Sequence, residues 1–217
     1  MNKLIYKELK IAASPLTYFF VAFAAMTLIP GYPILVGAFF ICFGIFQSFQ
    51  SAREANDILY SVLLPIKKSD VVKAKYLFTA WFQMIGFVLM MGLTILRMTA
   101  LADAAPYKTN VLMSANLVFL GFVLLIFASF NWFFLSGFFK TAYYYGKPFI
   151  TFIIMAFLLV GIGETLHHIP GLEFLNSVAG ADLLFQFILL CVAALLYILI
   201  TVYSYRKSKK RFEKIDL

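Results

Sequence analysis

The sequence predicts an all-α polytopic membrane protein with a single transmembrane domain over residues 1–217. Composition points to this class, because 63% of the residues are hydrophobic and only 13% are charged. A soluble domain has about 45–50% apolar and about 25% charged residues. The long apolar stretches show no strand-like alternation, and helices satisfy their own backbone hydrogen bonds in lipid. We therefore expect the excess apolar surface to face a membrane.

Six stretches are long enough to cross a bilayer, which takes about 20 mostly apolar residues in a helix. We expect these spans at about residues 12–29, 32–52, 76–99, 111–137, 148–166 and 181–204. Between the first two lie only Pro30, Gly31, Tyr32 and Pro33. This is a strong turn signal, because Pro breaks a helix and Gly tolerates positive φ. The first two spans are therefore predicted to form a tight helical hairpin.

The positions of the basic residues predict the orientation of the spans, because Lys and Arg mark cytoplasmic loops. All but two of the 18 gather in four segments: 1–12, 53–75, 138–147 and 206–217. Only Arg97 and Lys108 fall elsewhere. This split agrees at every loop with six spans and with both termini in the cytoplasm. The basic tail lies beside a span, so we expect it to attract anionic lipid headgroups and not nucleic acid.

The N-terminal arm, residues 1–12, has the pattern of an interfacial helix. Lys3, Lys7 and Lys10 recur at helical spacing, while Ile5 and Leu9 lie on the opposite face. A helix with one basic and one apolar face binds in the headgroup region of a membrane. We expect the arm to lie along the membrane surface ahead of the first span.

The segment 53–75 is the longest polar stretch between spans. It can be helical as far as Leu64, where Pro65 stops the helix. Ser69 is then expected to cap a second helix, with Asp70 in its first turn. A helix, a break and a second helix beneath the membrane could transmit force from a cytoplasmic partner. The simpler interpretation is a connecting loop whose lysines only set the orientation.

The residues of this segment form a pattern in which order and spacing count more than any single position. They are Glu54, Asp57, Leu59, Leu63, Leu64, Pro65, Ile66, Lys68, Val71, Val72, Lys75 and Tyr76. Lys7, Glu8 and Leu9 stand just ahead of the first span. With the tight hairpin, this pattern resembles the ABC-2 type transporter permeases, and more narrowly the short six-span permeases of Gram-positive bacteria.

The resemblance implies partners and roles that composition does not show. Such permeases pair as dimers, either with a second copy or with a paralogue, in the bacterial cell membrane. Two copies of a separate ABC-type ATPase sit beneath the pair and hold the ATP and Mg²⁺. The segment 53–75 would couple to that ATPase, with Glu54, Asp57, Leu59, Leu63, Leu64, Pro65 and Lys68 as the coupling residues. The arm with Lys7, Glu8 and Leu9 would be the elbow helix.

This chain is not expected to hydrolyse ATP itself. It has no Gly-x-x-x-x-Gly-Lys-Ser/Thr run to hold the phosphates. A membrane-embedded metal-dependent enzyme is an alternative, because Glu164, His167 and His168 share a helix-like spacing. No His-Glu-x-x-His motif is present, so no metal is expected. A third hypothesis is a peptide sensor or immunity protein that binds a peptide in the membrane without transporting it.

Two polar residues within the apolar stretches are candidates for a substrate path. Arg97 is placed near the outer interface, where it could pair with Asp103, Glu164 or Asp182. Asn131 lies inside the fourth span, where such a side chain usually bridges helices. Because the spans are rich in Phe, the expected substrate is a hydrophobic or amphipathic peptide, antibiotic or lipid. Export is the direction that the resemblance implies.

Overall fold

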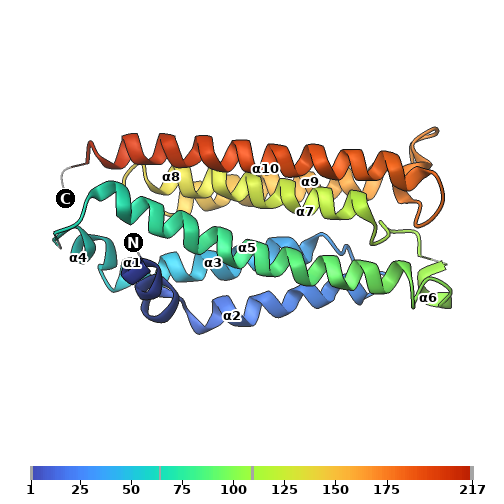
Figure 1. Ribbon diagram of the computed structural model, residues 1–217, viewed down its shortest axis with the longest axis horizontal. Coiled ribbons are helices and arrows are strands. Elements are labelled where there is room, and N and C mark those ends of the chain that lie inside the picture. The colour runs from blue at the N-terminus through green and yellow to red at the C-terminus, as the bar shows by residue number, and fades with distance from the viewer. Residues whose placement is uncertain (1, 64, 109, 216–217) are drawn as a thin grey trace.

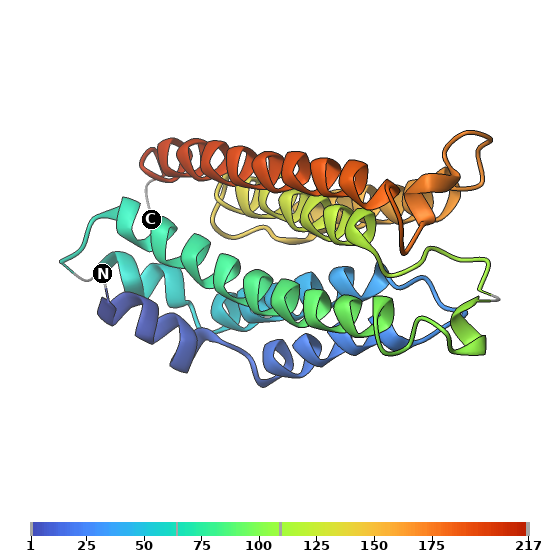
Figure 2. The same ribbon diagram turned by 45° about the vertical axis from the view of Figure 1, so that its right-hand side comes forward.

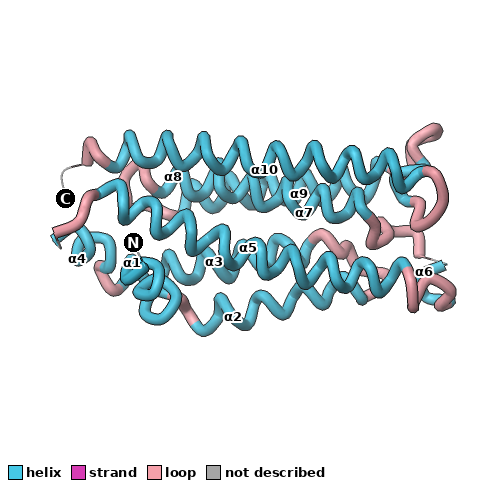
Figure 3. The backbone as a smooth tube through the Cα atoms, in the orientation of Figure 1, coloured by secondary structure: helices cyan, strands magenta, loops and turns pink. Residues whose placement is uncertain are grey.

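A computed structural model of the chain describes residues 2–63, 65–108 and 110–215. Within these residues the chain forms helices, turns and loops and no β-strand (Figure 3). The predicted all-α class is therefore confirmed.

The described residues of the first half of the chain form eight helical elements. They are α1 (Asn2–Lys7), the π-helical turn η1 (Glu8–Ala12), α2 (Pro15–Val21), the 3₁₀ helix η2 (Ala22–Leu28), α3 (Val36–Glu54), α4 (Asp57–Leu63), α5 (Lys68–Met98) and α6 (Ala105–Lys108). The second half follows with α7 (Leu117–Ser129), the π-helical turn η3 (Phe130–Leu135), α8 (Ser136–Phe138), α9 (Gly146–Leu166), the 3₁₀ helix η4 (Glu173–Asn176) and α10 (Asp182–Phe212).

Four helical segments in the described part of the chain are long and apolar enough to span a membrane. They are Lys68–Met98, Leu117–Phe138, Gly146–Leu166 and Asp182–Phe212. A fifth span is added if the bent pair Leu4–Lys10 and Pro15–Leu28, which meet at 80°, is taken as one. The remaining candidate, α3, has 19 residues and becomes polar toward Glu54. The chain is a multi-pass membrane protein, with four or five spans identified by length and composition.

The helices form an elongated bundle whose two ends differ (Figures 1 and 2). At one end lie both chain termini, α1 and α4; this is called the terminal end below. The short helix α6 and the loop that follows α9 lie at the opposite end. Helix α10 runs beside α7, and the two are close at Gly121, where a Cβ would be in van der Waals contact with the Cβ of Ala193 at 3.5 Å.

Phenylalanine side chains fill much of the interior between α3, η3 and α9. The rings of Phe46 and Phe149 stack with centroids 3.7 Å apart, and Phe134 meets Phe46 edge-on at 5.5 Å. Such pairs contribute about 0.5–1.5 kcal/mol each beyond the burial of their area. Gly44 lets α2 and α3 approach closely, because a Cβ there would lie 2.5 Å from the Cβ of Phe20.

Three local expectations differ from the structure. Helix α3 ends at Glu54 and α4 begins only at Asp57, because Asn56 takes a left-handed conformation with φ of 53°. The residue before α5 is Lys67 and not Ser69, since the backbone is already helical from Lys68. The predicted tail, 206–217, is largely the last part of α10.

Candidate functional site

Two acidic and two basic side chains meet at the terminal end and form what we call the charge cluster: Lys7, Glu8, Asp57 and Lys75. The ammonium nitrogen of Lys75 lies 2.5 Å from Glu8 Oε2 and 3.1 Å from Asp57 Oδ2. Lys7 lies 2.5 Å from Asp57 Oδ1 and 3.7 Å from Glu8 Oε1. Each lysine therefore contacts both carboxylates, and the four charges balance.

The charge cluster joins three segments that are far apart in the chain. Lys7 and Glu8 come from α1 and η1, Asp57 from the first turn of α4, and Lys75 from the second turn of α5. Lys7 also donates to the hydroxyl of Ser61, 2.5 Å away on α4. An acidic residue in the first turn of a helix is favourable, so α4 itself supports the charge on Asp57. The cluster thus fixes α4 against the N-terminal arm and α5.

Burial distinguishes this cluster from the other ion pairs between described residues, which are exposed. Glu8 is 1% exposed and Lys75 is 2% exposed. Burial alone would raise the pKa of Asp57, but the attraction of Lys75 and Lys7 outweighs it, so the pKa lies below the ordinary value. Asp57 is therefore ionised at neutral pH. Buried charges are tolerated only when paired in this way, and removing one partner costs about 3–5 kcal/mol.

Most of the predicted coupling residues that the structure describes lie on the outer surface of this region. The side chain of Leu63 is 78% exposed and that of the neighbouring Tyr60 is 67% exposed. Glu54 and Pro65 are also exposed. The side chain of Leu59 and the whole of Leu64 lie outside the described part of the chain. Helix α4 thus has an exposed face that includes apolar side chains and an inner face held by the charge cluster.

Lys68 and Leu9, two other predicted site residues, tie this region together. Lys68 donates to the carbonyl oxygen of Ile215 at 2.6 Å, which links the start of α5 to the C-terminus. The carbonyl oxygen of Leu9 accepts a hydrogen bond of 2.7 Å from the hydroxyl of Tyr18. The N-terminal arm and the C-terminal segment are therefore both held at the terminal end.

Asn131, one candidate for a substrate path, is enclosed by hydrogen bonds and is 1% exposed. Its amide nitrogen donates to Gln83 Oε1 at 3.2 Å and to Thr201 Oγ1 at 2.8 Å. Tyr197 donates to the same Gln83 oxygen at 2.9 Å. These bonds join η3, α5 and α10. A role for Asn131 in a substrate path stays a prediction that requires these helices to separate.

Arg97, the other candidate, does not take the predicted acidic partners. Its Nη1 donates to the carbonyl oxygen of Thr27 at 2.8 Å, and its guanidinium lies 4.4 Å from the ring centre of Tyr107. Asp103 instead pairs with Lys108 at 2.8 Å. Arg97 accordingly ties the end of η2 to α5 and borders a hollow at the opposite end of the bundle.

Glu164, His167 and His168, the residues of the enzyme alternative, also lie at the opposite end. Glu164 accepts the N–H of Met113 at 2.9 Å, and His167 contacts the carbonyl oxygen of Val111 at 3.2 Å. These contacts hold the loop ahead of α7 against α9. The described residues contain no group of three His, Cys, Asp or Glu side chains that could hold a metal ion.

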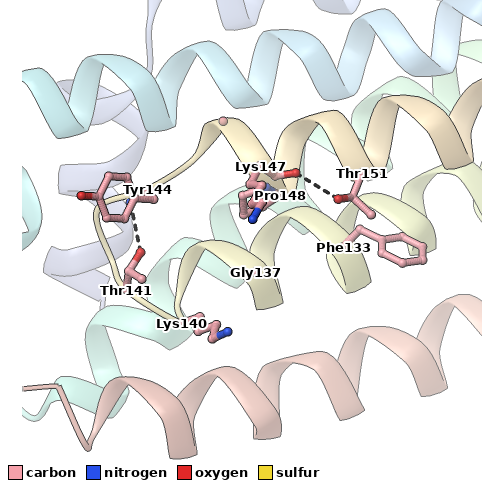
Figure 4. Close-up of a pocket in the computed structure, with 9 residues that line it drawn as sticks. Phe133, Gly137, Lys140, Thr141, Tyr144, Lys147, Pro148 and Thr151 are labelled. Carbon is pink, nitrogen blue, oxygen red and sulfur yellow. Dashed lines mark hydrogen bonds between the residues drawn. The ribbon is translucent and has the colours of Figure 1, made fainter.

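A surface hollow of about 510 Å³ lies between η3 with α8 and the start of α9 (Figure 4). Phe133 and Pro148 form apolar walls, and Lys140 and Lys147 border the hollow. A Cβ on Gly137 would lie 2.8 Å from the Cβ of Pro148, so this glycine allows the two helices to meet beneath the hollow. The lining combines apolar surface with positive charge.

From the sequence, Lys7, Glu8 and Asp57 are predicted as site residues, whereas Lys75 falls in the family-like pattern and among the orientation signals but not among the site residues. The exposed Tyr60 and the supporting Ser61 were also missed as site residues. One signal was present, because acidic side chains are scarce in this chain, with 10 against 18 basic ones. Glu8 is the single acidic residue of the basic segment 1–12, which suggests an internal partner.

The family comparison agrees with the resemblance noted in the sequence. The family model for the ABC-2 family transporter protein matches residues 3–213. The match covers nearly the whole chain, so the chain belongs to the ABC-2 transporter family, a family of membrane permeases. No curated protein and no solved structure matches the chain.

Proposed function

We propose that this protein is the membrane-spanning subunit of an ATP-driven ABC exporter in a bacterial cell membrane. It acts as a dimer, with a second copy or a paralogue, above two copies of a separate ATPase that hold the ATP and Mg²⁺. Membership of the ABC-2 family supports the transport role. A hydrophobic or amphipathic peptide, antibiotic or lipid is the proposed substrate, in keeping with the Phe-rich helices.

The proposed topology has six spans, with both termini in the cytoplasm. It takes α2 with η2 as the first span and α3 as the second, and the four longer segments as the others. The position of both termini, α1 and α4 at one end supports it (Figure 1), as does the gathering of basic residues in the segments at that end. The 80° bend after residues 4–10 supports an elbow helix that lies along the membrane.

Helix α4 is the proposed coupling element. The observation that carries this is its two-sided arrangement: Leu63 and Tyr60 are exposed on one side, while Asp57 is ion-paired to α1 and α5 on the other. Helix α5 has 31 residues and is about 46 Å long, which exceeds the ~30 Å hydrocarbon core of a bilayer. Its first turns, with Lys75, can therefore project toward the cytoplasm. ATPase closure would move α4, and the charge cluster would pass that movement to the elbow and α5.

Anionic lipids of the cytoplasmic leaflet are proposed partners at the hollow beside α9. Lys140 and Lys147 would meet the headgroup, and Phe133 would meet an acyl chain, because basic residues at the membrane surface attract anionic lipids. The apolar surface of α10, which exposes Leu184, Phe185 and many others, would face lipid or a second permease copy.

The coupling proposal is tested with the protein purified together with its cognate ATPase. As the proposed central anchor of the interface, Leu63 should behave as a hot-spot residue, and Leu63→Ala should weaken ATPase binding by at least about tenfold. Val111→Ala is the matched control, because Val111 is similarly exposed, by 71%, and lies at the opposite end of the bundle. Asp57→Asn should allow assembly but reduce the stimulated ATP turnover, since it alters the inner face of α4. If both substitutions leave assembly and turnover unchanged, α4 does not couple the two subunits.

A further inference from the structure

A polar hollow of about 240 Å³ lies at the opposite end of the bundle, between the end of α5, α6 and the loops around α7 and η4. It is far larger than one water molecule, whose share of liquid volume is about 30 Å³. Its polar lining residues are Arg97, Tyr107, Lys108, Asn110, Ser114 and Asn176. No carboxylate is among the described residues that line it, so the hollow combines two cations with amide and hydroxyl groups.

Arg97 is the buried cation of this hollow, with only 6% of its surface exposed. One of its N–H groups donates to the carbonyl oxygen of Thr27, and its guanidinium carbon lies over the ring of Tyr107. A guanidinium has five N–H donors. Among the described residues, none supplies a hydrogen-bond acceptor for the others. A buried guanidinium with spare donors at a hollow is arranged to bind an anion.

Asn110 provides a second, independent indication. Its carboxamide oxygen accepts the N–H of Leu112 at 3.1 Å, which fixes the orientation of the amide. Its Nδ2 is enclosed and has no hydrogen-bond partner in the described part of the chain. An enclosed donor without an acceptor costs about 1–3 kcal/mol. Asn110 lines the hollow, so a ligand oxygen there would remove that cost once the amide turns toward it.

Lys108 adds positive charge at the edge of the hollow. Its ammonium nitrogen pairs with Asp103 at 2.8 Å, but the side chain of Asp103 is 97% exposed. Exposed ion pairs are weak, so Lys108 remains able to turn toward a ligand. The uncompensated charge of the hollow is that of Arg97.

We propose that this hollow binds a phosphate group, either as free phosphate or as the headgroup of an anionic phospholipid. A phosphate offers several oxygens to the guanidinium of Arg97, to the enclosed amide of Asn110 and to Lys108 at once. The binding itself is independent of the proposed transport function. In the proposed topology this hollow lies at the outer face of the membrane, and only that placement rests on the proposed function.

The test uses the full chain purified in an uncharged detergent, with thermal unfolding followed as phosphate is added. Tm should rise by several degrees and saturate, because a ligand that binds only the folded state stabilises it. Chloride at equal ionic strength should not reproduce the rise. Asn110→Asp keeps the oxygen that Leu112 needs and replaces the free donor with a negative charge, so it should weaken phosphate binding at least about tenfold.

Arg97→Gln should weaken phosphate binding to a similar extent, and Arg211→Gln is its matched control. Arg211 also donates to a backbone carbonyl, that of Ser136 at 2.8 Å, but it lies at the terminal end. Arg211→Gln should alter the starting Tm without altering the response to phosphate. A response in Asn110→Asp equal to that of the unmodified protein overturns the proposal, even if Arg97→Gln does not fold.

Nanodiscs separate the two sources of the phosphate group. A higher Tm in phosphatidylglycerol than in phosphatidylcholine, lost in Asn110→Asp, supports a lipid headgroup. A response to inorganic phosphate alone supports a free anion, and no response to either refutes the site. The assay contains no ATPase, so its failure is distinct from a failure of the coupling experiment.

Discussion

Removing the buried ion pair between Glu8 and Lys75 should test the charge cluster most directly. At 2.5 Å and an effective dielectric constant of 20, their gross attraction is roughly 6–7 kcal/mol. Desolvation of two ions that are 1% and 2% exposed offsets most of it, at several kcal/mol each. The net value of the pair is therefore small, while the cost of leaving one partner unpaired is large.

Glu8→Gln and Lys75→Gln should each destabilise the protein by about 3–5 kcal/mol. For Glu8→Gln the lower figure applies, because Lys75 keeps Asp57 at 3.1 Å. The double substitution should cost clearly less than the sum of the two, since it leaves no unpaired charge. Reversible unfolding in mixed micelles, followed by circular dichroism, measures each free energy of unfolding.

Lys209→Gln provides the control for these measurements. It breaks the exposed pair with Glu213, whose atoms are 4.0 Å apart, and should change stability by no more than about 0.5 kcal/mol. Suppose that Glu8→Gln and Lys75→Gln each cost less than about 1 kcal/mol and add within about 0.5 kcal/mol. The pair would then be neither buried nor coupled, and the link from the N-terminal arm to α5 would have to be sought elsewhere.

Three further predictions follow from other contacts. Because the pKa of Asp57 is lowered in the folded state, its contribution to stability should be complete above the ordinary aspartate pKa of about 3.9 and be lost as pH falls below it. Tm measured against pH for the unmodified protein and for Asp57→Asn checks this. A difference in Tm between the two proteins that shrinks between pH 7 and 5 contradicts it. Gly44→Ala should lower Tm, since the new methyl group would overlap Phe20. Gly92→Ala should leave Tm unchanged, because no atom lies within 4 Å of the added methyl group. Equal effects of the two substitutions on Tm would refute the close approach of α2 and α3. Asn131→Leu should destabilise the protein by about 1–3 kcal/mol in the same unfolding assay, because it leaves buried partners without hydrogen bonds; an unchanged free energy would exclude the bridging role.

Much of the fold could be predicted because hydropathy and turn chemistry act locally. The hairpin at Gly31, with φ of 76°, lies where the Pro and Gly residues indicate it. Most of each apolar stretch is helical, but α3 begins at Val36 and α7 at Leu117, later than the predicted starts at 32 and 111. Helix α5 begins earlier and α10 ends later than hydropathy suggests. Those extensions are polar turns of helices that continue beyond their apolar stretches, and a hydropathy pattern alone does not predict them.

The break at Asn56 was not predicted because a run of helix-compatible residues hides it. Nothing in the local sequence requires α3 to stop at Glu54, and Asn tolerates a left-handed conformation only as one option among several. Once Asn56 adopts it, α4 turns away from α3 and Asp57 reaches the two lysines. Tertiary contacts select this geometry.

The sequence by itself determined that this is a helical membrane protein of the ABC-2 family, since hydropathy, basic-residue placement and motif spacing are written along the chain. Only the tertiary structure decided which charges are internal. Glu8 and Lys75 both look like surface residues of polar segments, yet they lie buried against each other. Arg97 bonds to a backbone carbonyl on η2 and not to the acids expected for it. The physical reason is that burial of a charge depends on partners brought together from distant segments, and no local pattern records them.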